Sequence, residues 1–258
     1  MAVAKRLPAV AGTFYPESPV QLRSHVERYL AAAKNFHISP KCIIAPHAGY
    51  VYSGPVAGVA YAQLGSLPPR HRRIILLGPS HHQRFTGAGF ADYAVWQTPL
   101  GEIRTLPPPA SPIFSDQTAA HNPEHCLEVQ LPFLQTVLSD FEILPLLTGD
   151  VDPAILATAI GPLIDGQTLL IISSDLSHYL PYQQANAVDA VANAIIPAVD
   201  LRNVQHLDAC GDSAIITALY LAKKFGWRGQ LLDYKNSGDT AGAKDAVVGY
   251  GAYAFTAT

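Results

Sequence analysis

Short apolar runs alternate with helix-like segments along most of this chain. Three of the runs, residues 41–45, 73–77 and 167–172, each lead into a turn that carries a histidine. Runs of this length, closed by Gly, Pro or Ser and separated by helical patterns, are typical of buried parallel strands. Ligand sites in open α/β sheets lie at the carboxyl ends of the strands. The pattern therefore predicts imidazoles along one edge of a sheet, where a metal or a substrate would be held.

The rest of the pattern predicts helices on both faces of this sheet. Helices are expected at residues 22–33, 53–64, 127–138, 153–163, 182–196, 201–207 and 211–225. Further strands are expected at residues 142–147, 230–234 and 246–255, and a hairpin within residues 86–104. The alternation predicts an α/β sandwich with a mixed, mostly parallel central sheet. No linker or repeat interrupts the sequence, so a single domain over residues 1–258 is expected.

Composition narrows the class of protein. With 49% hydrophobic and 14% charged residues, the chain is typical of a globular protein with a large core. Its net charge of −3 gives no electrostatic basis for binding nucleic acid or an anionic membrane. The first eight residues lack the apolar segment of a signal peptide, and no apolar run reaches the roughly 18 residues of a membrane span. Three widely spaced cysteines without a CxxC motif favour a reducing compartment, so a cytoplasmic protein is expected.

Two histidines directly follow predicted strands. His47 and His81 each lie in a turn shaped by Pro or Gly. A neutral imidazole in such a turn is a good ligand for iron, zinc or copper. For a single histidine of this kind, the more common role is a hydrogen bond to a backbone group that stabilises the turn. Two at neighbouring strand ends, with a third within reach, favour a shared ion.

Asp175 and His178 form an Asp-x-x-His unit after the third apolar run, at an expected strand-to-helix junction. Asp175 could cap the following helix. It could also orient His178, either as support for a metal ligand or as the partner of a general base. Both interpretations stay open at the level of sequence.

A polar cluster, residues 121–130, opens the predicted helix at residues 127–138. Glu124 and Glu128 are one turn apart and would face the same side, with His125 pointing elsewhere. The helix dipole explains Glu124 equally well. A buried Glu128 beside an imidazole would be functional.

Cys210 precedes the predicted helix at residues 211–225. A helix N-terminus lowers the pKa of a thiol, which favours a thiolate that binds metal or acts as a nucleophile. The alternative is a small buried hydrophobe, which is the interpretation for Cys42 inside its apolar strand. Cys126, within the polar cluster, stays open.

Several linked motifs resemble those of a known family. Their order is RLPAVAGTFYP (6–16), APHAGY (45–50) with YSG (52–54), LGPSHH (77–82), HCLEVQLPF (125–133), SDLSHY (174–179) and CG (210–211). This order is similar to that of the Memo (mediator of cell motility) family, whose prokaryotic members are called AmmeMemoRadiSam system protein B. The resemblance extends from Leu7 to Phe255. That family in turn resembles the catalytic subunits of class III extradiol dioxygenases, which are non-haem iron enzymes, and this implies their mixed-sheet α/β fold here.

The resemblance also implies site residues. In Memo-like proteins, the residues that match His47, His81 and Cys210 bind iron or copper, and those that match Asp175 and His178 line the same pocket. His178 is similar to the acid/base histidine of the dioxygenases, and His125 and Glu128 are carried over as further catalytic candidates. The dioxygenases have a carboxylate where this chain has Cys210. A thiolate there shifts the metal preference towards copper or zinc.

Three functions are open at this stage. The first is a metal-dependent, dioxygenase-like oxidoreductase that uses iron, with copper or zinc as alternatives, in which Asp175 orients His178 for proton transfer. The second is a non-catalytic module that binds a peptide or protein partner in the same cleft, behind an aromatic rim of Tyr50, Tyr52, Phe85, Trp96 and Tyr179. The ligand expected in the pocket is a small molecule or a peptide. The third is a zinc-dependent hydrolase. The name of the prokaryotic members implies a functional link to a radical SAM enzyme and an Ammecr-type protein, and no partner among nucleic acids or membranes is expected.

Overall fold

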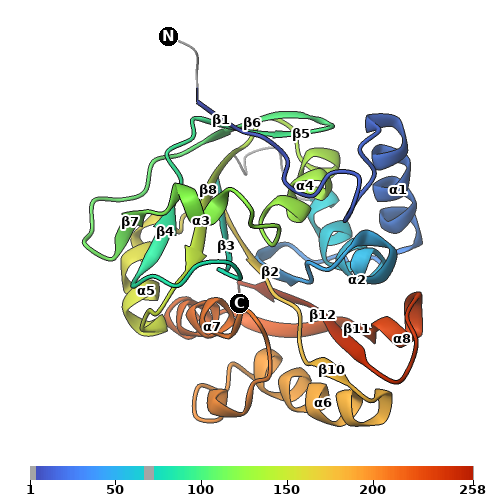
Figure 1. Cartoon of the computed structure of the whole chain (residues 1–258). Coiled ribbons are helices and arrows are strands. Elements are labelled where there is room, and N and C mark those ends of the chain that lie inside the picture. Colours follow the sequence, from blue (N-terminus) through green and yellow to red (C-terminus); the bar gives the residue numbers. More distant parts are fainter. Residues whose placement is uncertain (1–3, 67–72, 258) are drawn as a thin grey trace.

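The computed structural model describes residues 4–66 and 73–257. These residues form a mixed β-sheet with helices on both faces (Figure 1). The strands are β1 (Lys5–Arg6), β2 (Pro40–Ala45), β3 (Arg73–Pro79), β4 (Ala88–Phe90), β5 (Val95–Thr98), β6 (Gly101–Thr105), β7 (Phe114–Asp116), β8 (Glu142–Thr148), β9 (Thr168–Ser173), β10 (His178–Leu180), β11 (Arg228–Asn236) and β12 (Val247–Thr256). The α-helices are α1 (Pro19–Ala32), α2 (Tyr50–Ala62), α3 (Thr118–His121), α4 (Leu131–Val137), α5 (Pro153–Ile160), α6 (Tyr182–Ala198), α7 (Asp212–Phe225) and α8 (Ser237–Thr240). Short 3-10 helices are η1 (Gln63–Ser66), η2 (Glu128–Gln130), η3 (Gly161–Leu163) and η4 (Val204–His206).

The three apolar runs that end in histidine turns become adjacent strands at the centre of the sheet. The strand order is β1-β5-β6-β8-β3-β9-β2-β12-β10, with β11 paired to β12 and β4 paired to both β7 and β8. Strands β8, β3, β9 and β2 run parallel to one another. Strand β12 joins β2, and β11 joins β12, in the antiparallel direction. The predicted mixed sheet with a parallel centre is confirmed, and the loops that follow β3, β9 and β2 meet at one edge.

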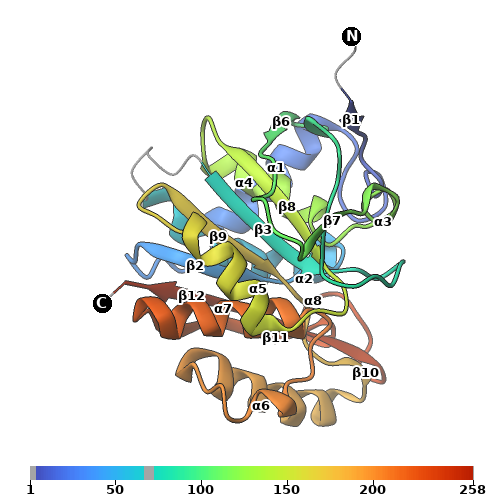
Figure 2. The ribbon, with the colours of Figure 1, turned by 90° about the vertical axis from the view of Figure 1, so that its left-hand side faces the viewer.

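Side chains of the central strands alternate between two hydrophobic cores. In β9, Leu169 and Ile171 belong to one core and Leu170 and Ile172 to the other, because successive strand residues face opposite sides of the sheet. Helices α1, α2 and α4 contribute to the first core, and α5, α6 and α7 to the second (Figures 1 and 2). Burial on both faces explains why these strands are continuously apolar in the sequence.

Two predicted helices differ from the structure. The helix expected at residues 127–138 is a turn followed by η2 and the short helix α4. The Glu124 carboxylate accepts hydrogen bonds from the backbone N–H groups of His125 and Cys126, which stabilises the turn in place of a helix start. The helix expected at residues 201–207 is only the single turn η4.

The Asp175–His178 unit also differs from its prediction. His178 begins strand β10, which pairs with β12, and helix α6 starts only at Tyr182, after Pro181. Asp175 therefore caps no helix. The predicted hairpin within residues 86–104 is present as β5 and β6, which pair antiparallel.

Among the described residues, no helix combines the length and the apolar character needed to cross a bilayer. The first eight residues were expected to lack the apolar segment of a signal peptide. Residues 1–3 of this segment lie outside the described part of the chain. Lys5 and Arg6 of that segment form β1, which pairs with β5.

Candidate metal centre

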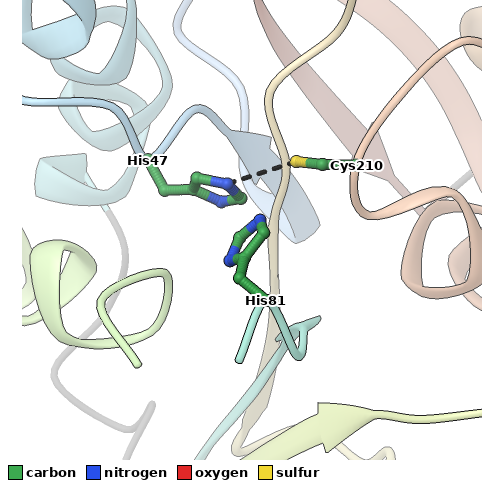
Figure 3. Close-up of side chains that lie close together, drawn as sticks. All are labelled: His47, His81 and Cys210. Atoms are coloured by element: carbon green, nitrogen blue, oxygen red, sulfur yellow. Dashed lines mark hydrogen bonds between the residues drawn. The ribbon is translucent and has the colours of Figure 1, made fainter. Parts of the chain in front are cut away.

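The loops at the carboxyl edge of the sheet bring the predicted ligands together. His47 follows β2, His81 follows β3 and Asp175 follows β9, which lies between the other two strands. Cys210 reaches the same place from the segment before α7, and its side chain points towards the two imidazoles (Figure 3). Residues 163 positions apart in the chain thus become neighbours.

The distances in this cluster suit a single metal ion. The Nε2 atom of His47 lies 3.2 Å from the Sγ atom of Cys210 (Figure 3). One ligand atom each from His47, His81 and Cys210 lie within 4.8 Å of one another. Donor atoms that share a first-row ion lie roughly 3–4 Å apart, because metal–ligand bonds are about 2.0–2.3 Å long. Two imidazole nitrogens and one sulfur therefore form a donor set that a small adjustment would close around an ion.

A cavity of about 810 Å³ opens beside this cluster. Among the predicted site residues, those that line it are His47, His81, His125, Asp175 and His178. None of the described residues that line it is Lys or Arg. The cavity therefore offers imidazoles and one carboxylate to a ligand, with no fixed cation for an anionic group.

The aromatic wall of the cavity differs from the predicted rim. Tyr52 and Tyr179 line it and are exposed, at 40% and 75% respectively. Tyr50 and Trp96 are instead buried in the core, and Phe85 packs against that core. The sequence did not single out the other two aromatic wall residues, Phe14 and Tyr250.

His47 is buried and held through both its backbone and its ring. Its backbone N–H donates to Oδ1 of Asp175 at 2.7 Å, and its Nδ1 lies 3.0 Å from Oγ of Ser173. Burial, together with the neighbouring His81, lowers the pKa of His47 to about 3. The imidazole is thus neutral near pH 7, which is the form that binds a metal.

His81 is held by a buried carboxylate instead. Its Nδ1 lies 2.9 Å from Oε1 of Glu124, and its backbone N–H donates to Oε2 at 2.7 Å. Burial lowers the pKa of His81, but the hydrogen bond and the charge of Glu124 outweigh it and raise the pKa overall. For Glu124 the two influences have the opposite signs. Burial raises the pKa of Glu124, but its interactions with His81 and with the backbone N–H of Cys126 outweigh burial and bring the pKa well below its usual range.

Glu124 supports His81, a role that the sequence did not predict. The sequence left this residue open between a carboxylate on the same side as Glu128 and a partner of the helix dipole, whereas its carboxylate orients His81 and also accepts from the backbone of His125 and Cys126. No local pattern links it to His81, which lies 43 positions earlier. The general rule that a metal-bound histidine donates its second nitrogen to a carboxylate or carbonyl could have identified it.

Asp175 hydrogen-bonds to His47 of the candidate cluster, and with His178 it has an interaction of charges only. Its Oδ1 accepts from the His47 backbone, and its Oδ2 lies 4.0 Å from Nε2 of His47. Among the hydrogen bonds of the described residues, none joins Asp175 to His178, although both line the cavity. Burial raises the pKa of Asp175 to about 6, against the hydrogen bond from His47. The predicted orientation of His178 by Asp175 therefore has no hydrogen bond to support it among the described residues, and it stays a prediction.

The lowered pKa expected for Cys210 is wrong. Burial, followed by the charge of Asp175, raises the pKa of the thiol to about 12. Helix α7 begins two residues later, at Asp212, and the hydrogen bonds that lower the pKa of this thiol, among them that from the backbone N–H of Asp175 at 3.3 Å, are outweighed. A thiolate at this position therefore requires a nearby cation, and a coordinated metal deprotonates a thiol outright.

His125 and Glu128 lie on opposite sides of their turn. The His125 ring faces the cavity and stacks on His81, with centroids 4.9 Å apart, and burial lowers its pKa to about 4. Glu128 is fully buried and accepts from Arg6 Nη1 and Tyr15 Oη, each at 2.6 Å. The structure thus brings His125 into the cavity and places Glu128 outside it, as an anchor for the N-terminal segment.

Two further groups of side chains are close enough to share an ion. They are His81, Glu124 and Cys126, and His82, Glu124 and His125. Both depend on Glu124, whose oxygens already lie within hydrogen-bonding distance of three backbone N–H groups and two ring nitrogens. In the group of His47, His81 and Cys210, the sulfur has longer contacts, with the backbone N–H of Asp175 at 3.3 Å and with Oγ of Ser174 at 3.9 Å.

The fold and the site define an α/β protein with a cluster of two histidines and one cysteine at the carboxyl edge of its sheet. The model of the Memo-like protein family matches residues 6–254. MEMO1 family proteins from Archaeoglobus fulgidus and Desulfurococcus amylolyticus are 35% and 36% identical to this chain, and each alignment covers 97% of the chain and 99% of the relative. The MEMO1 family protein from Sulfolobus acidocaldarius is 35% identical, over 95% of the chain and 97% of the relative. The chain belongs to the Memo family.

One solved structure is similar at greater distance. It is the uncharacterized protein JW3007 from Escherichia coli K12, with a TM-score of 0.47 and 13% sequence identity. The likeness covers 82% of this chain and 99% of that one. Similarity at this level says nothing about the site.

Proposed function

We propose that this Memo-family protein holds one metal ion between His47, His81 and Cys210 and uses it in redox chemistry on a ligand in the adjacent cavity. The observation that carries the proposal is the approach of Cys210 Sγ to His47 Nε2 at 3.2 Å, with His81 completing the group. The rest of the site supports it, since both imidazoles have a partner at Nδ1, which leaves Nε2 for a metal.

We expect iron as the metal, with copper or zinc as alternatives. Imidazole nitrogens suit all three, and the thiolate favours the softer copper and zinc. When bound, a redox metal would polarise or exchange electrons with a ligand in the cavity. Three protein donors would leave such an ion able to bind a ligand as well.

The residues of this chain would bind and protonate that ligand. His178 and His125 line the cavity and present imidazoles, which can hydrogen-bond to a ligand and act as general acids or bases. Asp175 supplies a carboxylate to the wall, and the aromatic side chains of Phe14, Tyr52, Tyr179 and Tyr250 supply apolar surface. These features favour a neutral or cationic small molecule, or a peptide side chain. The three free thiols support our placement of the protein in the cytoplasm.

Metal loading tests the proposal. Purified protein would be loaded anaerobically with Fe(II), copper or zinc in turn, and bound metal would be counted per chain. One ion per chain is expected for at least one of these metals, and each of the substitutions His47→Ala, His81→Ala and Cys210→Ser should abolish stoichiometric binding. The absence of stoichiometric binding for all three metals would refute the proposal.

His82→Ala is the matched control, because His82 is adjacent to His81 in sequence and belongs only to the group with Glu124 and His125. It should retain one ion per chain. If His82→Ala loses the ion and Cys210→Ser retains it, the metal would instead be assigned to the group of His82, Glu124 and His125. Anomalous scattering at the metal edge from a crystal soaked with Fe(II) would identify the ligands directly.

A further inference from the structure

A chain of buried hydrogen bonds runs beneath the metal cluster and ends at His47. It begins at Tyr61, whose hydroxyl lies 2.8 Å from Oε1 of Gln130. The Nε2 atom of Gln130 lies 3.0 Å from the carbonyl oxygen of Pro46 and 2.8 Å from Oγ of Ser173. Ser173 is the last residue of β9 and is fully buried, as is Tyr61, while Gln130 is 1% exposed.

The direction of the bonds at Gln130 is fixed by its neighbours. A peptide carbonyl only accepts hydrogen bonds, so the amide group of Gln130 must turn its NH₂ towards Pro46. The second N–H of the same group then points to Ser173. The amide oxygen is left for Tyr61, whose hydroxyl donates to it. Gln130 is therefore a donor to Ser173.

The direction at Ser173 follows in the same way. Its Oγ lies 2.7 Å from the carbonyl oxygen of Cys126, which again only accepts, so the single hydroxyl proton is committed there. One lone pair of Oγ accepts from Gln130. The other faces Nδ1 of His47 at 3.0 Å, and without a proton on Nδ1 two lone pairs would face each other at this distance in a buried place. The Nδ1 atom of His47 must carry a proton.

We infer that Ser173 and Gln130 are positioning residues that hold the neutral His47 ring as its Nδ1–H tautomer, with the lone pair of Nε2 directed at Cys210. The Nε2 atom is the one that lies 3.2 Å from the sulfur (Figure 3). The use of this lone pair for a metal rests on the proposed function. The tautomer itself is a property of the metal-free protein.

The polar segment at residues 121–130 thereby supports both histidines. The backbone N–H of Cys126 donates to Glu124, which holds His81. The backbone carbonyl of the same residue accepts from Ser173, which holds His47. One peptide segment therefore sets the orientation of two ligands that come from different strands.

Nitrogen NMR of the histidine rings in metal-free protein at neutral pH tests the inference. Long-range proton–nitrogen correlations should show Nδ1 of His47 as the protonated nitrogen and Nε2 as the unprotonated one, with the signals assigned by their loss in His47→Asn. A protonated Nε2 would overturn the inference whether or not metal binds. Failure to bind metal with the expected tautomer would overturn only the proposed function.

Ser173→Ala extends the test to the metal. It removes the acceptor for Nδ1, so the single tautomer should give way to a mixture, and the affinity for the metal should fall by about 10- to 100-fold. Thr168→Val is the matched control, because it removes a buried hydroxyl from the first residue of the same strand, β9, far from His47. It should change neither the tautomer nor the affinity. An unchanged tautomer in Ser173→Ala, or an equal loss of affinity in Thr168→Val, would contradict the inference.

Discussion

The two histidines of the candidate metal centre face the same cavity but are held in opposite ways. His47 is 2% exposed, and its Nδ1 meets the neutral hydroxyl of Ser173. The side chain of His81 is 29% exposed, and its Nδ1 meets the carboxylate of Glu124. The pKa of the first is lowered and that of the second is raised.

This difference shows how two histidines of one site can be held with different tendencies to bind a proton. A neutral hydrogen-bond chain selects a tautomer without adding charge, so the buried His47 stays neutral down to acidic pH. A carboxylate raises the basicity of its imidazole and so makes His81 the stronger donor to a metal. Three substitutions test whether the two histidines are held independently, and the first should disturb both of them.

The largest effect is expected from Arg6→Met. The Arg6 guanidinium donates to Glu128, to the carbonyl of Glu124 and to that of His121, and its side chain is 1% exposed. Removing it leaves the buried Glu128 carboxylate without its ion-pair partner, which should lower the free energy of unfolding by about 3–5 kcal/mol. Because residues 121–130 support both histidines, ring NMR signals of His47 and His81 should both broaden or shift.

Lys5→Met is the control for Arg6→Met. Lys5 is the preceding residue, and its ion pair with Glu102 has side chains 42% and 49% exposed. A pair of this kind contributes about 0–1 kcal/mol, so little change in denaturant midpoint is expected. A loss in Arg6→Met as small as that in Lys5→Met would show that Arg6 does not anchor the segment.

The next effect, from Glu124→Gln, should be larger on His81 than on His47, because the Glu124 carboxylate bonds directly to the His81 ring. The amide matches the shape of the carboxylate but turns an NH₂ group towards a backbone N–H or a ring N–H, which should cost about 1–3 kcal/mol of stability. The pKa of Glu124 is lowered, so its contribution is present above about pH 4.3, its unfolded value, and is lost as the pH falls. The pKa of His81 is raised, so its contribution is present below about pH 6.5 and is lost as the pH rises through the folded value.

The difference in unfolding free energy between wild type and Glu124→Gln should therefore be largest between about pH 4.3 and 6.5. Urea denaturation of both proteins at a series of pH values measures it, and the His47 tautomer should be the same in both. A difference that grows steadily above pH 7 would contradict the assigned ion pair. A changed His47 tautomer would contradict the separation of the two histidines.

The sequence predicted the parts of this site that depend on local pattern. Apolar runs of five or six residues with Pro, Gly or Ser after them placed His47, His81 and Asp175 at strand ends, because buried parallel strands have that composition. The rule for ligand sites in α/β sheets then placed these residues at one edge. Cys210, which approaches from another loop, was assigned through the family resemblance as well as its position before a helix.

The support of the site could not be predicted in this way. Glu124 and Ser173 act on residues 43 and 126 positions away, and neither hydrophobic periodicity nor motif spacing contains such pairings. The expected pKa of Cys210 was wrong for a related reason. Its helix position is a local property, whereas its burial results from the packing of distant loops and has the larger effect.

The smallest effect is expected from Tyr61→Phe, at the far end of the chain that leads to His47. The change removes the donor to Oε1 of Gln130 but keeps the stacking of ring 61 on Phe133, so it should cost about 1 kcal/mol. The NH₂ group of Gln130 still faces the Pro46 carbonyl, so Gln130 should still donate to Ser173 and the His47 tautomer should persist. Tyr253→Phe is the control, since it removes a similarly buried hydroxyl, bonded to Asn193, from the other hydrophobic core. If both variants lose the same stability and keep the tautomer, the bond that fixes the tautomer is that between Ser173 and His47. If Tyr61→Phe alone loses the tautomer, the orientation of Gln130 depends on Tyr61.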